Sequence, residues 1–501
     1  MSTLETTNQS KKNRKFLDYD SYSSNAANES KYFLLPFKFH RLKSGNEVLV
    51  NEVGDFLIAE NGSANRIIRR EIDKIKDHKL YADLISGFFI SESPIDPLID
   101  VLATRYRTKK LFLNYFTGLH IFVISLRCEH TCQYCQVSRV TQNKDKYDMS
   151  RYHIDKGIEL MFKSPNPNLT MEFQGGEALL AFDNIKYAVE RAKPIAKELN
   201  KNLTIVICSN LALLDDEILE YCKQHHILLS ASLDGPKFIH DTNRHKPHAS
   251  SYDLTIQGIK RAREVLGHDR VSALMTTTKL SLDYPVEIVN EYFNLGFQGI
   301  FLRNISPYGF ALRTDKAKYD TGKFIDFYKT ALNRILEINR SGHFFTEDLA
   351  RIFLIKMLTP FNVGFVDLQS PSGLINGVIV YNYDGTVYAT DESRMLAEQK
   401  DYTFKLGTLD DSYEDLYFGD KAQEISEVWI NESLAGCSEC AFQQYCGADP
   451  VHNHATQGDM YGFRPTSDFC KKNMEIIEYL MELLHSDDET RKILERWAFI
   501  K

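Results

Sequence analysis

The chain has 501 residues, which is enough for two or three domains with sizeable hydrophobic cores. Its hydrophobic content of 43% and charged content of 26% are ordinary for a globular protein. The formal net charge of −8 disfavours a nucleic-acid partner, because such proteins usually carry a basic surface. No run of about 20 apolar residues occurs, so we expect no membrane-spanning helix and no membrane partner.

The first 30 residues are polar and contain no apolar core of signal-peptide length. We expect residues 1–30 to form a disordered tail and the protein to be cytoplasmic. Seven of the nine cysteines stand in spacings typical of metal sites, which fits a reducing compartment better than a disulfide framework. The other two, Cys208 and Cys222, fall within a predicted strand and a predicted helix, and we expect both in the core.

Residues 31–110 predict a small α+β domain. Strands over about 47–50 and 55–59 flank a turn, and helices over about 64–76, 79–87 and 95–106 follow. A hairpin followed by short helices resembles the winged-helix domains that bind leader peptides of ribosomally made, modified peptides. In such a domain the peptide adds as a strand to the edge of a sheet. A purely structural cap on the next domain is the alternative.

Residues 111–310 predict an α/β fold. Apolar strands over about 119–127, 169–173, 203–209, 227–233, 271–276 and 299–303 alternate with amphipathic helices. Repeated strand–helix units imply a parallel sheet with right-handed crossovers. Six units indicate a partial (β/α)6 TIM-type barrel, whose functional residues are expected at the C-terminal ends of the strands.

Three thiols follow the first of these strands, at Cys128, Cys132 and Cys135. Each iron of a four-iron cluster needs a ligand, so three cysteines leave one iron open for chemistry. A zinc site, or three unrelated thiols, is the alternative. Polar residues end the following strands, namely Gly175-Gly176-Glu177, Asn210, Ser232 and Arg303-Asn304.

The spacing Cys-X3-Cys-X2-Cys, with Tyr134 before the third cysteine, resembles the radical S-adenosylmethionine (SAM) superfamily. The resemblance implies that the three cysteines hold a [4Fe-4S] cluster whose open iron binds SAM. One electron from the cluster then cleaves SAM to a 5′-deoxyadenosyl radical, which abstracts hydrogen from a substrate.

The same resemblance assigns contacts to SAM. The Gly175-Gly176-Glu177 motif is expected at its methionine end, where glycines allow close approach and a carboxylate can accept a bond from the ammonium. Tyr134 is expected against the adenine, Asn210 and Ser232 as polar contacts, and Arg244 at the SAM carboxylate. Simple packing of Tyr134 and a surface position for Arg244 are the alternatives.

Residues 311–375 predict a helical connection, helical over about 320–358, and a hairpin from about 377–381 and 386–389 opens the last domain, residues 376–501. There, Cys437, Cys440, Cys446 and Cys470 supply four thiolates. These could complete a [4Fe-4S] cluster or a tetrahedral zinc site. We expect the nearby His452 and His454 to be structural rather than ligands.

The second cysteine set resembles the SPASM extension of peptide-modifying radical SAM enzymes, which carries seven cysteines and two auxiliary clusters. Here Ala389 and Pro450 stand where that family has cysteines, and the segment around Gly407 lacks one. The resemblance therefore implies one auxiliary [4Fe-4S] cluster and two clusters in all.

From about Tyr32 to the end, the chain is most similar to the His-Xaa-Ser system radical SAM maturases. The stretches Tyr32-Phe-Leu-Leu-Pro-Phe, Val50-Asn-Glu-Val-Gly54 and 120–139 carry the resemblance. It implies a precursor peptide or protein with His-Xaa-Ser repeats as substrate, a second radical SAM protein as partner, and an electron donor such as flavodoxin or ferredoxin.

The product is expected to be a crosslink or a thioether. Serine or cysteine oxidation, as in sulfatase maturases, is the alternative; it needs a general base, and the cysteines beside that family's aspartate base are missing here. A further alternative, outside the enzymes, is an iron–sulfur protein that acts in electron transfer or as a sensor. RNA modification is disfavoured by the acidic charge balance.

Overall fold

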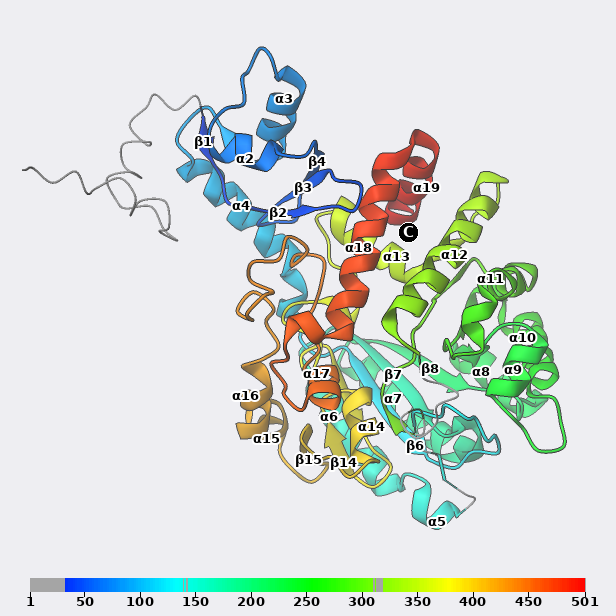
Figure 1. The fold of residues 1–501 in the computed structure, drawn as a ribbon. Coiled ribbons are helices and arrows are strands. Elements are labelled where there is room, and N and C mark those ends of the chain that lie inside the picture. The colour runs from blue at the N-terminus through cyan, green and yellow to red at the C-terminus, as the bar shows by residue number, and fades with distance from the viewer. Residues whose placement is uncertain (1–31, 138, 141–142, 310, 312–318, 501) are drawn as a thin grey trace, which may run out of the picture. The chain divides into compact units, whose positions relative to one another are not determined.

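The computed structural model describes residues 32–137, 139–140, 143–309, 311 and 319–500. The chain divides into two compact units, residues 1–105 and 106–501, shortly before the predicted boundary at residue 110. Figure 1 shows the elements of both units in chain order. The predicted tail, residues 1–30, lies outside the described residues. Among the described helices, none is both long and apolar enough to cross a membrane.

The N-terminal unit contains a three-stranded antiparallel sheet. Its strands are β2 (Phe37–Arg41), β3 (Glu47–Asn51) and β4 (Phe56–Ala59), in the order β2-β3-β4. A short pair, β1 (Phe33–Leu34) and β5 (Ile90–Ser91), and the helices α2 (Ser63–Ile68), α3 (His78–Ser86) and α4 (Asp96–Lys109) complete the elements that begin in this unit. The predicted hairpin is present as β3–β4, and β2 extends it.

Helix α2 is shorter than the predicted stretch of about 64–76. It ends at Ile68, and Arg70 then adopts a positive φ of 59°, which a right-handed helix does not allow. The unit has its own core, in which Tyr32, Leu49 and Phe89 are fully buried.

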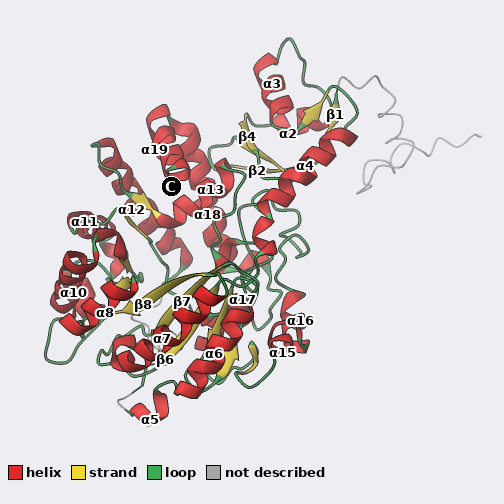
Figure 2. Cartoon of the chain, turned by 180° about the vertical axis from the view of Figure 1, so that it is seen from behind, coloured by secondary structure: helices red, strands yellow, loops and turns green. Residues whose placement is uncertain are grey.

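The large unit is built on one eight-stranded sheet in the order β10-β9-β8-β7-β6-β13-β14-β15. The parallel strands are β6 (Leu119–Ser125), β7 (Asn168–Gly175), β8 (Asn202–Ser209), β9 (Leu228–Ser232) and β10 (Val271–Leu274). Helices connect them, including α6 (Arg151–Lys163), α7 (Phe182–Glu198), α8 (Asp216–His225), α9 (Lys237–Asn243) and α10 (Ser251–Leu266). Figure 2 shows α6 and α7 covering one face of this sheet. The predicted α/β class with a partial TIM-type barrel is confirmed.

The sixth predicted strand differs from expectation. Only Gly299–Ile300 (β11) is a strand, and it pairs in parallel with β12 (Thr346–Glu347) in a separate sheet. Leu302 N donates to the buried Glu347 carboxylate instead of continuing a ladder. One backbone hydrogen bond, from Thr277 N to Arg303 O at 2.9 Å, connects the segment to the end of β10.

The C-terminal hairpin is present as predicted, with β13 (Val378–Tyr381) antiparallel to β14 (Thr386–Tyr388). An unpredicted pairing joins β13 to β6 in parallel, with Val378 opposite Leu119. Strand β15 (Lys405–Thr408) completes the edge. The region after the barrel therefore extends the barrel's own sheet.

Long helices complete the large unit. They are α11 (Pro285–Asn294), α12 (Thr321–Arg340), α13 (Asp348–Leu358), α18 (Asp468–Ser486) and α19 (Asp488–Phe499). Helix α12 packs against α11 and α18, and α13 packs against α19 (Figure 1). The chain after the hairpin also forms shorter helices, among them α14 (Asp391–Ala397), α15 (Tyr413–Phe418), α16 (Asp420–Ser426) and α17 (Pro450–Gln457).

Candidate cofactor and substrate site

The loop with Cys128, Cys132 and Cys135 leaves the C-terminal end of β6 and is anchored by a buried ion pair. Arg127 donates from Nε to Asp148 Oδ1 at 2.6 Å and from a terminal nitrogen to Oδ2 at 2.7 Å. The two side chains are 9% and 6% exposed. Bidentate geometry of this kind fixes orientation, so the entry of the cysteine loop is held rigidly.

The double glycine lies directly against this entry. Gly176 N donates to Ser125 O at 2.8 Å, and Glu177 N donates to Arg127 O at 2.7 Å. Gly175 has φ +141°, and a Cβ there would lie 1.9 Å from Ser125 O; at Gly176 a Cβ would lie 2.3 Å from Arg127 O. The glycines are therefore required for packing β7 onto the loop entry, whatever else they approach.

Glu177 is buried and already accepts three bonds from the protein. Leu179 N and Ser209 Oγ donate to Oε1, and Asn210 N donates to Oε2. Burial, and then the neighbouring Glu129 carboxyl, raise the pKa of Glu177 to about 7. Because a carboxylate has about four acceptor positions, at most one stays open for the predicted contact with SAM.

Glu129, next to the first cysteine, was missed from the sequence. Asn210 Nδ2 donates to its Oε1 at 2.9 Å, whereas its Oε2 is buried without a hydrogen-bond partner. The donor atoms of Cys128, Glu129 and His130 lie within 4.8 Å of one another. Both ring nitrogens of His130 are already engaged, by Glu129 and by Ser251. Glu129 Oε2 is thus a free acceptor beside the cysteines.

Tyr134 and Arg244 meet at the buried Asp234. The Tyr134 hydroxyl donates to Asp234 Oδ2 at 2.8 Å, Arg244 Nε lies 3.1 Å from Oδ1, and the guanidinium lies 5.4 Å from the centre of the Tyr134 ring. The Arg244 side chain is only 14% exposed, so it is not a surface residue, and its charge is compensated within the protein. Ser232 ends β9 at the same edge of the sheet. The predicted contacts of these residues with SAM stay predictions.

The four C-terminal cysteines come together from a turn-rich segment and from the first turn of α18. Burial, followed by the thiols of Cys446, Cys440 and Cys437, raises the pKa of Cys470 to about 12. Asn473 Nδ2 lies 3.7 Å from the Cys446 sulfur. His454 hydrogen-bonds to Asp401 at 2.7 Å, which agrees with a structural role.

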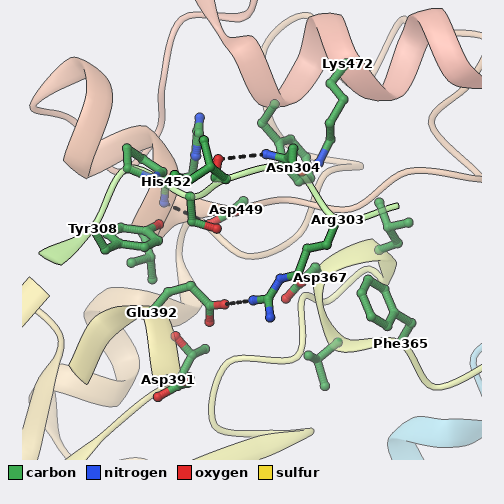
Figure 3. A pocket seen from close by; sticks show the side chains of 18 of the residues that line it. Arg303, Asn304, Tyr308, Phe365, Asp367, Asp391, Glu392, Asp449, His452 and Lys472 are labelled. Atoms are coloured by element: carbon green, nitrogen blue, oxygen red, sulfur yellow. Dashed lines mark hydrogen bonds and ion pairs between the residues drawn. The ribbon is translucent and has the colours of Figure 1, made fainter. Parts of the chain in front are cut away.

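A cavity of about 620 Å³ lies inside the large unit, between the barrel strands and the C-terminal region. Figure 3 shows its charged wall, where Arg303 lies near Glu392 and Lys472 near Asn304. This wall is hydrogen-bonded to the end of the cysteine loop. Gln136, the residue after Cys135, donates from Nε2 to the wall residue Ser306 at its backbone oxygen, 3.1 Å away. Cys208 was expected in the core, but it lines this cavity, because alternate residues of β8 face the interior of the barrel. Cys222 is buried as predicted.

The carboxyl groups of this cavity were not predicted as site residues. Burial, followed by the charge of Asp449, raises the pKa of Asp367 to about 6. Burial, followed by Asp367 and Asp391, raises the pKa of Glu392 to about 8. These residues lie far apart in the sequence, so only the fold identifies them as one group.

Comparison with known proteins identifies the barrel. Residues 122–292 match the model of the Radical SAM superfamily. A protein described as uncharacterized from Methanothermobacter thermautotrophicus is 30% identical over 182 residues, covering 36% of this chain and 65% of its own. The radical SAM cyclopropyl synthase TigE of Paramaledivibacter caminithermalis is 22% identical over 317 residues, covering 55% and 64%. The chain thus matches less than two thirds of the length of these two relatives.

Three further similarities extend beyond the barrel. The cysteine-type anaerobic sulfatase-maturating enzyme of Clostridium perfringens is 22% identical over 329 residues, covering 62% of this chain and 86% of its own. The structure of native anSMEcpe with bound AdoMet superposes with a TM-score of 0.60 at 18% identity, covering 77% and 100%. Streptococcus suis SuiB bound to precursor peptide SuiA gives a TM-score of 0.51 at 15% identity, covering 88% and 100%. At these identities the two structures establish the fold alone.

Proposed function

We propose that the chain is a radical SAM enzyme, since residues 122–292 match the Radical SAM superfamily, and that it modifies a ribosomally made peptide or protein after translation. The observation that carries the proposal is the position of the cavity. Its wall at Ser306 is hydrogen-bonded to Gln136, the residue after the third cysteine, so a substrate side chain in the cavity would lie beside the cysteine loop.

The residues at the loop fit the cofactors of the superfamily. Cys128, Cys132 and Cys135 would hold the cluster, and the unpartnered Glu129 Oε2 would accept a bond from the SAM ammonium. When bound, the cluster and SAM supply the 5′-deoxyadenosyl radical that abstracts hydrogen. Burial raises the pKa of Cys132 to about 12, so the thiols must release protons to bind iron, and iron affinity should fall as pH falls.

The second set, Cys437, Cys440, Cys446 and Cys470, would hold one auxiliary [4Fe-4S] cluster. Because it offers four thiolates, no iron stays open for SAM. Two clusters predict about eight irons per chain. About four irons with one zinc would instead identify the C-terminal set as a zinc site.

The substrate proposed here carries His-Xaa-Ser repeats, as the resemblance implies, and a crosslink or thioether is the proposed product. A second radical SAM protein, and flavodoxin or ferredoxin as electron donor, are the proposed partners in the cytoplasm. Serine or cysteine oxidation is the second candidate. It is supported by Asp367, a half-buried carboxyl in the cavity whose raised pKa of about 6 suits a general base near neutral pH.

The N-terminal unit is proposed to bind the leader segment of the substrate. Strand β4 is an edge of its sheet, and a groove of about 580 Å³ runs along it, lined by Phe56, Leu57 and Phe88. An extended peptide could add to this edge. Phe56→Glu should then weaken precursor affinity, whereas Phe39→Glu, on the opposite edge strand β2, should not. Equal effects of the two changes would leave the unit as a structural cap.

The test of the proposed function is co-expression with a candidate precursor, followed by mass spectrometry. A mass shift that is absent with Cys132→Ala is expected. Loss of two hydrogens fits a crosslink, a thioether or oxidation of a serine to an aldehyde, which fragmentation then separates, whereas oxidation of a cysteine to an aldehyde also exchanges sulfur for oxygen. Reduced, reconstituted protein that releases no 5′-deoxyadenosine even with the precursor would instead indicate an electron-transfer or sensor protein.

A further inference from the structure

Lys356 is a buried lysine beside one of the C-terminal cysteines. It belongs to α13, is only 6% exposed, and donates from Nζ to two backbone oxygens, that of Leu368 and that of Cys446, the latter at 3.2 Å. Both acceptors are neutral, and among the described residues no carboxylate forms an ion pair with Lys356. Burial of an ammonium is unfavourable unless an opposite charge lies nearby, so Lys356 calls for an anion.

The one carboxylate beside this lysine is already neutralised. Glu432 lines the same small cavity as Lys356, but it is ion-paired with Lys110 at 2.6 Å and accepts a bond from the Tyr106 hydroxyl at 2.8 Å. The cavity measures about 30 Å³, which is room for about two water molecules, so no organic or phosphate ion fits there. The other side chain around it that can become negative is Cys446.

A second, independent contact also favours a negative sulfur at Cys446. Asn473 is only 1% exposed, and its Nδ2 donates to Cys446 Sγ at 3.7 Å. A thiolate accepts such a bond more strongly than a neutral thiol does. Because Asn473 belongs to α18 and Lys356 to α13, two separate helices direct a donor to the same cysteine.

Lys356 also connects two segments of the backbone. A Cβ at Gly447, the residue after Cys446, would lie 2.6 Å from Asp367 O, and the next residue along that segment, Leu368, accepts a bond from Lys356. This connection alone would make Lys356 a structural residue. A test therefore has to separate the connection from the charge.

We propose that Lys356 is the counter-charge of the four-cysteine site and that, together with the N–H group of Asn473, it raises the reduction potential of the cluster held at Cys446. The proposal rests on the auxiliary [4Fe-4S] cluster of the proposed function. A four-iron cluster on four thiolates is an anion, and its potential depends on nearby charge and on hydrogen bonds to its sulfurs. The reduced cluster carries one more electron than the oxidised one, so a buried positive charge stabilises the reduced form more.

The test is a redox titration of the reconstituted full chain, with both clusters followed by electron paramagnetic resonance. The signal of the C-terminal cluster is assigned in the triple alanine variant of Cys128, Cys132 and Cys135. Lys356→Met should lower the midpoint potential of this cluster by at least about 59 mV, a tenfold shift in the ratio of reduced to oxidised cluster for one electron. Asn473→Leu should lower it as well. The other cluster should keep its potential and serves as the internal control.

Two further variants separate the charge from other effects. Lys471 directly follows Cys470, but its side chain is exposed, so solvent screens its charge and Lys471→Met should shift the ratio by less than about twofold. Lys356→Gln keeps N–H donors but carries no charge. It should lower the potential as Lys356→Met does.

A potential that is unchanged in Lys356→Met or Lys356→Gln, at about eight irons per chain, would overturn the proposal and leave Lys356 as a structural link. If neither variant retains the C-terminal iron, Asn473→Leu decides, since an unchanged potential there would overturn the proposal as well.

Mass spectrometry of a co-expressed precursor, run in parallel on the wild type, keeps the two proposals apart. A missing mass shift together with a lowered potential in the variants would reject the proposed modification alone, whereas a mass shift with unchanged potentials would reject the counter-charge alone. One zinc in place of about four irons would reject both the auxiliary cluster and the role of Lys356.

Discussion

The ion pair between Arg127 and Asp148 offers a sharp test of what holds the cysteine loop. Asp148→Asn keeps the shape of the side chain but leaves a guanidinium buried without a counter-charge. Both partners are under 10% exposed, so we expect a loss of about 3–5 kcal/mol, the range for breaking a buried pair. The loop entry at Ser125 should also be destabilised, because the Ser125 hydroxyl donates to Asp148 as well.

A second arginine–aspartate ion pair, which is exposed to solvent, serves as the control. Arg261 and Asp216 lie at the same 2.6 Å separation, but their side chains are 34% and 98% exposed. Asp216→Asn should therefore change stability by only about 0–1 kcal/mol. The comparison tests burial together with the bidentate geometry of the buried pair, since residue types and the shortest distance are the same.

The assay combines urea unfolding with hydrogen exchange of the peptide that spans residues 119–137, both on reconstituted protein. Asp148→Asn should unfold at lower urea and expose this peptide, and its iron content should fall. The double variant Arg127→Met/Asp148→Asn should be no less stable than Asp148→Asn alone, because no buried charge stays unpaired. Equal, small effects of Asp148→Asn and Asp216→Asn would refute the reasoning.

Three further outcomes follow from the structure. Gly175→Ala should lower iron from about eight to about four per chain, because its Cβ would clash with Ser125 O; unchanged iron would show that the strand end can shift. Cys437→Ala should also remove about four irons, but SAM-dependent release of 5′-deoxyadenosine should be retained. Loss of that release would indicate that SAM is cleaved at the C-terminal cluster instead. Burial raises the pKa of Glu347 to about 7, so its protonated form is favoured in the folded state and stability should fall as pH rises from about 4.5 to 7, by roughly 3 kcal/mol. Glu347→Gln should flatten that slope in urea titrations at several pH values, and an unchanged slope would assign it to other groups.

Local patterns predicted the strands at the centre of the molecule well. The cysteine loop after one apolar strand and the double glycine after the next lie together, because strand ends of a parallel barrel meet at one edge. The predicted reason for the double glycine, close approach to SAM, was incomplete, however. Gly175 and Gly176 pack against the backbone of Ser125 and Arg127, a contact that depends on the register between β6 and β7 and that no local pattern encodes.

Features made by distant segments could not be predicted. The pairing of β13 with β6 depends on the complementarity of two apolar strands far apart in the chain. The cavity acids Asp367, Asp391, Glu392 and Asp449 come from the segment before β13, from α14 and from the residue before α17. Each of them alone has the appearance of an ordinary surface carboxyl, and only their position around one cavity makes them a group.

The central claim is that the loop at Cys128, Cys132 and Cys135 is where SAM is cleaved. The most direct measurement is 5′-deoxyadenosine release by reduced, reconstituted protein, in wild type and in the triple alanine variant of these cysteines. We predict release in the wild type and none in the variant, which should keep the iron of its C-terminal set. Release that persists in the variant, or that is absent from the wild type with its full iron content, would contradict the account.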